Sequence, residues 1–139
     1  MSPDLELYDY LYEQCMKLTP QTYDYLPSEK EKGFEYPFIH VGNITENGAM
    51  TKTSHSASFS IVIDVWGKKN QRRKVSELAD KVYWLGSQVF TTANHRFYAQ
   101  IDNQQKQILI DNSVPNTVYV RGMVTLKFYL EEEITWQHH

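Results

Sequence analysis

The sequence predicts an α+β domain in which a mainly antiparallel or mixed β-sheet carries two main helices on one face, in the order α-β-β-α-β-β-β. Apolar and polar residues alternate from Ser58 to Trp66, which is the period of a strand with one buried face. Apolar residues then recur at the spacing of one helical face from Val75 to Val89. The 139 residues suit a single domain with one core.

The first element is predicted to be a helix over residues 1–18. Ser2 can cap it, and Pro3 suits the first helical position. Thr19 precedes Pro20 and should end the helix, because a residue before proline avoids helical geometry. Its predicted buried face consists of Leu5, Tyr8, Tyr12 and Cys15 or Met16.

A polar connection over 19–35 should follow, in which Tyr23, Tyr25 and Leu26 can form a short extended piece. Residues 38–44 are rich in strand formers. Residues 45–57 have almost no large apolar side chain, so we expect a long mobile arm there, or ragged strand ends.

Three more strands are expected after the second helix. They cover Arg96–Ile101, Gln107–Ile110 and Val118–Leu130, with turn-forming residues between them.

Several protein classes are disfavoured by the sequence. Cys15 is the only cysteine, so neither an intramolecular disulfide nor a multi-cysteine zinc site is expected, and a reducing cytoplasm is the natural compartment. We expect neither a signal peptide nor a transmembrane helix, since no apolar run approaches about 20 residues. His138 and His139 are typical of a purification-tag remnant.

The residues that carry chemistry in enzymes form no recognisable motif here. His40, His55 and His95 lie on three different predicted elements without metal-ligand spacing. The sequence does not place Asp64 beside Asp102 or Asp111, and acids at strand ends are usually solvated. We therefore expect no catalytic residue, no cofactor and no metal, and the chain is predicted not to be an enzyme.

Two charged runs are the candidate contact sites. The net charge of -3 disfavours a surface built for nucleic acid, and no sequence-specific nucleic-acid binding is expected. The basic run opposes the dipole of the helix that follows it, so local helix stability does not explain it. It is a phosphate contact, a docking surface for an acidic partner, or a solvated loop. The basic run comprises Lys68, Lys69, Arg72, Arg73 and Lys74, and the acidic run comprises Glu131, Glu132 and Glu133.

The acidic run has two open interpretations as well. It could meet the basic run on a neighbouring copy, or it could be a solvated strand end. Ten tyrosines add large rings with one polar end, which suit interfaces.

Several segments, taken in order, resemble one family. They are Tyr36-Pro37-Phe38-Ile39-His40-Val41-Gly42, then Thr51-Lys52-Thr53, then Ile63-Asp64-Val65-Trp66-Gly67 and a helix starting near Val75. The chain is similar here to the tail-completion family of long-tailed bacteriophages, also called tail terminators or tail-to-head joining proteins. The likeness covers about half of the chain and continues loosely into Arg121-Gly122-Met123-Val124. The tyrosine-rich first helix and the long connection depart from the family pattern.

The resemblance implies a structural protein of a phage or prophage that assembles with itself into a ring, usually of six. Such a ring sits at the tail end or neck of the virion, having assembled in the host cytoplasm. Its other implied partners are the tail tube protein and a head-closure or connector protein. No contact with a membrane is expected. The proposed contacts are Thr51, Lys52 and Thr53 in the arm together with the basic and acidic runs.

Two alternatives remain open. One is another phage neck component, such as a head-closure or minor capsid protein. The other is a cytoplasmic α+β domain that binds a small molecule, for which a deep pocket with clustered ionisable side chains would be the sign.

Overall fold

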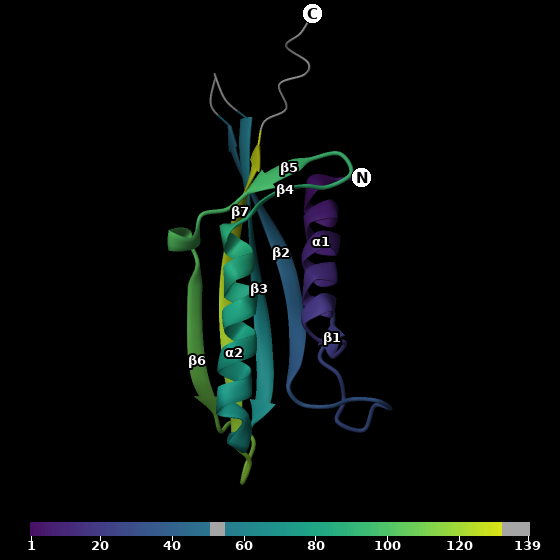
Figure 1. Cartoon of the computed structure of the whole chain (residues 1–139), viewed down its shortest axis with the longest axis vertical. Coiled ribbons are helices and arrows are strands. Elements are labelled where there is room, and N and C mark those ends of the chain that lie inside the picture. The colour runs from purple at the N-terminus through teal and green to yellow at the C-terminus, as the bar shows by residue number, and fades with distance from the viewer. Residues whose placement is uncertain (51–54, 132–139) are drawn as a thin grey trace, which may run out of the picture.

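The computed structural model of the chain describes residues 1–50 and 55–131. The predicted α+β class is confirmed: two helices lie against a curled, mixed sheet of seven strands (Figure 1). Helix α1 spans Pro3–Leu18 and α2 spans Arg72–Tyr83. The strands are β1 (Thr22–Tyr23), β2 (Phe38–Met50), β3 (His55–Lys68), β4 (Val89–Thr91), β5 (Arg96–Tyr98), β6 (Gln105–Asp111) and β7 (Tyr119–Glu131).

The sheet has the strand order β1-β2-β3-β7-β5-β4, and β6 also pairs with β7. Strands β5 and β6 share the same edge of β7 at different heights: Tyr98 pairs with Tyr129, whereas Gln105 pairs with Thr125. The short β1 runs parallel to β2, and the other pairs are antiparallel. No helix in the described part of the chain is long and apolar enough to cross a membrane.

The core lies between one face of the sheet and the two helices. The alternation in β3 buries Phe59, Ile61, Ile63 and Val65 on that face, as the sequence predicts. Strand β7 adds alternate residues from Val120 to Phe128. Helix α2 contributes Val75, Ala79 and Val82.

Helix α2 approaches the sheet closely at two glycines. A Cβ added to Gly122 of β7 would lie 2.8 Å from the Cβ of Ala79, closer than real Cβ atoms come. A Cβ at Gly67 of β3 would overlap the side chain of Val75. Both positions therefore need glycine for space, and together they set the depth at which α2 packs.

The predicted buried face of the first helix is partly wrong. The buried stripe of α1 is Leu7, Leu11 and Cys15, whereas Leu5 and Met16 are exposed. Tyr8 and Tyr12, which the sequence predicts to be buried, lie half-buried beside this stripe. Their hydroxyls donate to the carbonyls of Val41 and Thr22 at 3.5 and 3.0 Å. At this boundary each tyrosine packs its ring against the core while its hydroxyl reaches a backbone carbonyl, and the aliphatic residues fill the fully buried stripe.

Residues 45–57 are predicted to form a long mobile arm or ragged strand ends, and their described part forms strand ends. Residues 45–50 continue β2 and residues 55–57 begin β3, so the described residues on both sides of 51–54 are paired strand ends that extend past the ends of both helices (Figure 1). Ladder pairing between Ile44↔Ile61 and Met50↔His55 orders this polar stretch despite its weak strand propensity. Thr51, Lys52 and Thr53 lie outside the described residues.

The second helix is shorter than its apolar spacing predicts. It ends at Tyr83, a 3₁₀ turn covers Trp84–Ser87, and Val89 lies in β4, where it pairs with Tyr98. The predicted strand over 96–101 likewise stops at Tyr98, because Ile101–Asn103 form another 3₁₀ turn.

One buried carboxylate fastens α1 to the turn between β4 and β5. Glu6 is buried and accepts hydrogen bonds from the Thr92 hydroxyl at 2.5 Å and from the Asn94 backbone N–H at 3.0 Å. The Asn94 side-chain amide donates at 2.7 Å, and Nδ1 of His95 lies 3.2 Å away. The hydrogen bond from Thr92 has the largest effect on the pKa of Glu6 and lowers it, whereas burial raises it. The hydrogen bonds from Asn94 add to the lowering, and the pKa falls from 4.5 to about 2.

This arrangement predicts a stability loss in acid. Because the folded pKa lies below the unfolded value, the contribution of Glu6 is complete above about pH 5 and is lost as the pH falls towards 2. Urea unfolding at pH 7, 4 and 3 should therefore show a wild-type advantage over Glu6→Gln that shrinks as the pH falls. Glu13→Gln on the exposed side of the same helix should follow wild type, and a constant gap between Glu6→Gln and wild type would contradict this role.

Candidate interaction surfaces

The basic run forms one end of the molecule. Strand β3 ends at Lys68, a 3₁₀ turn covers Lys69–Gln71, and α2 begins at Arg72. All five cations predicted as contacts are exposed, and none forms an ion pair within the described part of the chain. They are Lys68, Lys69, Arg72, Arg73 and Lys74.

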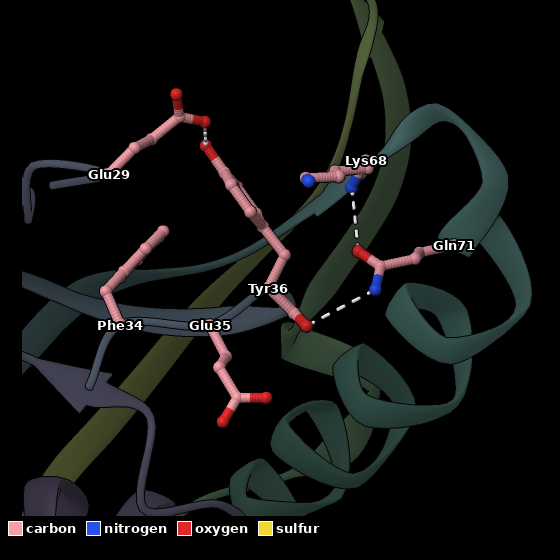
Figure 2. A pocket seen from close by; sticks show the side chains of 6 residues that line it. All are labelled: Glu29, Phe34, Glu35, Tyr36, Lys68 and Gln71. Atoms are coloured by element: carbon pink, nitrogen blue, oxygen red, sulfur yellow. Dashed lines mark hydrogen bonds between the residues drawn. The ribbon is translucent and has the colours of Figure 1, made fainter. Parts of the chain in front are cut away.

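Gln71 holds this end in one conformation. Its side-chain oxygen accepts a hydrogen bond from the Lys68 backbone N–H at 2.9 Å, and its amide nitrogen donates to the Tyr36 carbonyl at 3.3 Å (Figure 2). The neutral glutamine thus joins the start of β2 to the turn before α2. The cations project from a fixed backbone, which reduces the entropy that a partner must overcome.

Beside the basic run lies an open hollow of about 420 Å³. It is lined by Glu29, Phe34, Glu35, Tyr36, Lys68 and Gln71 (Figure 2). The Tyr36 hydroxyl donates to Glu29 at 2.5 Å, the Tyr119 hydroxyl approaches the same oxygen at 3.3 Å, and the Lys68 ammonium lies 5.6 Å from the centre of the Tyr36 ring. These contacts tie the connection 19–35 to the end of the sheet.

Acidic and basic side chains line this hollow together, Glu29 and Glu35 on one hand and Lys68 on the other. Burial, and then the hydrogen bond to Glu29, raise the pKa of Tyr36 well above its usual value, so its hydroxyl stays protonated. A second open hollow of about 560 Å³ adjoins the first, shares Glu29 and Lys68 with it, and reaches Lys69 and Asn116. The basic end is therefore an indented, mixed-charge surface that suits contact with another macromolecule.

The acidic run begins at the other end of the sheet. Glu131 is the last residue of β7 and forms an ion pair with Arg96 of β5, its register partner. Glu132 and Glu133 lie outside the described residues. Tyr119, at the start of β7, pairs with Lys68, so the basic and acidic ends are separated by the length of β7, about 40 Å. Within one chain Glu131, the described residue of the acidic run, therefore does not reach the basic run.

The sheet face opposite the helices carries a contact that sequence reasoning missed. Asp64 is 6% exposed although no helix covers it. The Arg121 guanidinium binds it in a two-pronged geometry at 2.9 and 3.1 Å and lies 5.2 Å from the centre of the Trp66 ring. Alternation places Asp64 and Trp66 on this face, but only the β3–β7 register brings Arg121 beside them.

The other candidate ionisable residues do not gather into a site. Asp102 lies in a 3₁₀ turn, and Asp111 accepts hydrogen bonds from Ser113. His40 lies in β2 and His95 contacts Glu6. Among residues 1–50 and 55–131, no group of three or more metal-ligating side chains could hold an ion.

Comparison with solved structures finds the same fold in a phage-like particle. A chain from the virion of a native gene transfer agent particle superposes with a TM-score of 0.66 at 15% identity, over 95% of this chain and 100% of that one. A second structure, named Np_888769.1, has a TM-score of 0.52 at 10% identity, over 96% and 98% of the two chains. No protein-family model and no curated protein sequence matches the chain.

Proposed function

We propose that this chain is a structural protein of a bacteriophage or prophage that forms a ring at the tail end or neck, terminates the tail tube and joins it to the head. The observation that carries the proposal is the shared fold with a virion chain along essentially the whole of both chains. The sequence resemblance to the tail-completion family supports the same assignment. The carboxylate, amide and ammonium groups that line the hollows can form hydrogen bonds and ion pairs with a protein partner.

The separation of charge supports two different partners. The exposed cations lie at one end of the sheet and Glu131 at the other, about 40 Å away. Copies arranged side by side in a ring would expose these two ends on opposite surfaces of the ring. In this proposal one surface meets the tail tube protein and the other meets a head-closure or connector protein.

Deletion of the gene in the phage that encodes it tests this role. We expect filled heads and separate tails, with tail tubes of uneven length, and restored joining when the gene is supplied from a plasmid. Electron microscopy of lysates distinguishes these products. Normal, infectious particles after deletion would overturn the proposal, and heads without DNA would indicate an earlier role in capsid assembly.

A further inference from the structure

The sheet has two unlike open edges. Strand β6 pairs only with β7 in the described part of the chain, so one edge of Gln105–Asp111 is free along its seven residues. On the other side, β1 covers β2 only at Ile39 and His40, so no strand among residues 1–50 and 55–131 pairs with the outer edge of residues 44–50. The two free stretches have equal length.

The β6 edge lacks the features that normally prevent pairing with another chain. It contains no proline, and its one lysine, Lys106, is directed to Asp80 of α2 at 2.9 Å. Leu109 and Ile110 remain 37% and 52% exposed. Natural edge strands usually avoid exposed aliphatic residues and use charge or proline instead, so this edge is suited to a strand partner.

The β2 edge opens onto a complementary hollow. An open space of about 450 Å³ lies between the first half of α1 and the strand, lined by Asp4, Leu5, Tyr8, Asp24, Asn43 and Ile44. Leu5 in it is 47% exposed. One exposed aliphatic residue on β6 of another copy could cover both Leu5 and Ile44.

We infer that β6 of one copy pairs antiparallel with residues 44–50 of β2 of the next copy, with Ile110 opposite Ile44 beside Leu5. This inference rests on the proposed ring and specifies how its subunits join. The direction follows from the sheet: β2, β3, β7 and β6 alternate in direction, so copies of equal orientation bring β2 and β6 together antiparallel.

The register follows from the two faces. Ile110 pairs with Val120 and Ile44 with Ile61, and both partners point towards the helices. Placing Ile110 opposite Ile44 therefore keeps the helix-covered faces of both sheets on one side. The same register puts Leu109 opposite Thr45 on the uncovered face.

The offset between the two edges is compatible with closure. Measured along β3, Ile110 is aligned with Gly67 through β7, whereas Ile44 is aligned with Ile61. Pairing Ile110 with Ile44 therefore shifts each copy along the strands by six residues, about 20 Å, relative to its neighbour. Four strand spacings per copy span about 19 Å. Strands inclined at about 45° to the ring axis would cancel this shift, close to the 35–45° tilt of closed barrels.

Disulfide cross-linking of the full chain tests this pairing. Ile44→Cys/Ile110→Cys and, on the exposed face, Thr45→Cys/Leu109→Cys should each form intermolecular disulfides on mild oxidation. The mismatched pair Ile44→Cys/Leu109→Cys should give at least roughly tenfold less, because its side chains point to opposite faces. Burial raises the pKa of Cys15 to about 12, so the native thiol should not react.

The possible outcomes separate this inference from the proposed function. A ladder of oligomers from both matched pairs supports the edge pairing. Cross-linked dimers from a mixture of the single variants Thr45→Cys and Leu109→Cys, but from neither variant alone, support it as well. Dimers from Leu109→Cys alone would indicate a twofold contact between β6 strands and overturn it. If wild type forms rings by light scattering while neither matched pair cross-links, the pairing is wrong and the ring stands. If wild type is monomeric at 1 mM concentration and no pair cross-links, the pairing is also wrong, while the gene deletion still decides the function.

Discussion

The double substitution Arg72→Glu/Arg73→Glu should reduce the joining of heads and tails at least a hundredfold. Both side chains are exposed at the first turn of α2, beside the indented surface formed with Glu29 and Lys68. Like charges brought together at an interface cost several kcal/mol, and each 1.4 kcal/mol corresponds to a tenfold change in affinity. Plasmid complementation of the gene deletion, scored by plaque titre and by counting joined particles, gives the measurement.

A matched control carries the same change in charge elsewhere. Lys17→Glu/Lys81→Glu alters two exposed cations on α1 and α2, away from the turn before α2, and should leave joining within a few-fold of wild type. Acid residues at the start of a helix are favourable, so the reversal at residues 72 and 73 should not unfold α2. Normal joining by the reversed variant would show that the basic end is not a docking surface.

Phe59→Ala should destabilise the domain by about 3–5 kcal/mol, which is the usual cost of removing a buried aromatic ring. Phe59 is fully buried, and its ring centre lies 5.8 Å from that of Phe97. Phe97 in turn stacks with Phe90, so the cluster joins β3 to the β4–β5 hairpin. Urea unfolding followed by circular dichroism should show a lower transition midpoint with an unchanged slope.

The exposed residue Leu26 provides the comparison for this core substitution. Leu26→Ala removes a side chain that is 65% exposed, and it should change the free energy of unfolding by less than about 0.5 kcal/mol. Equal effects of the two substitutions would contradict the assignment of Phe59 to the core. A loss confined to the β4–β5 hairpin, detected by hydrogen exchange, would limit its role to that hairpin.

The sequence predicts the fold best where one physical cause dominates. Alternation in β3 identifies the buried face correctly, because one side of this strand lies in the hydrophobic core beneath α2. The short strands are different. Val89 fits a helical face by its spacing, yet pairing with Tyr98 places it in β4, and this tertiary hydrogen bonding leaves no local signal.

The candidate surfaces show the same division. The sequence alone identifies the basic run, and its five cations prove exposed, while their role in docking stays a prediction. The separation of this run from Glu131 depends on the β3–β7 register, and so does the contact of Arg121 with Asp64. The free edge of β6 depends on the strand order, which local patterns do not encode.

Electron cryomicroscopy of the assembled particle would show directly whether this chain forms the proposed ring. We expect one closed ring of this chain between the head and the last ring of the tail tube. The surface carrying Lys68 and Arg72 should face one partner, and the surface carrying Glu131 should face the other. A particle in which this chain lies in the capsid shell or along the tail, or is absent from the neck, would contradict the account.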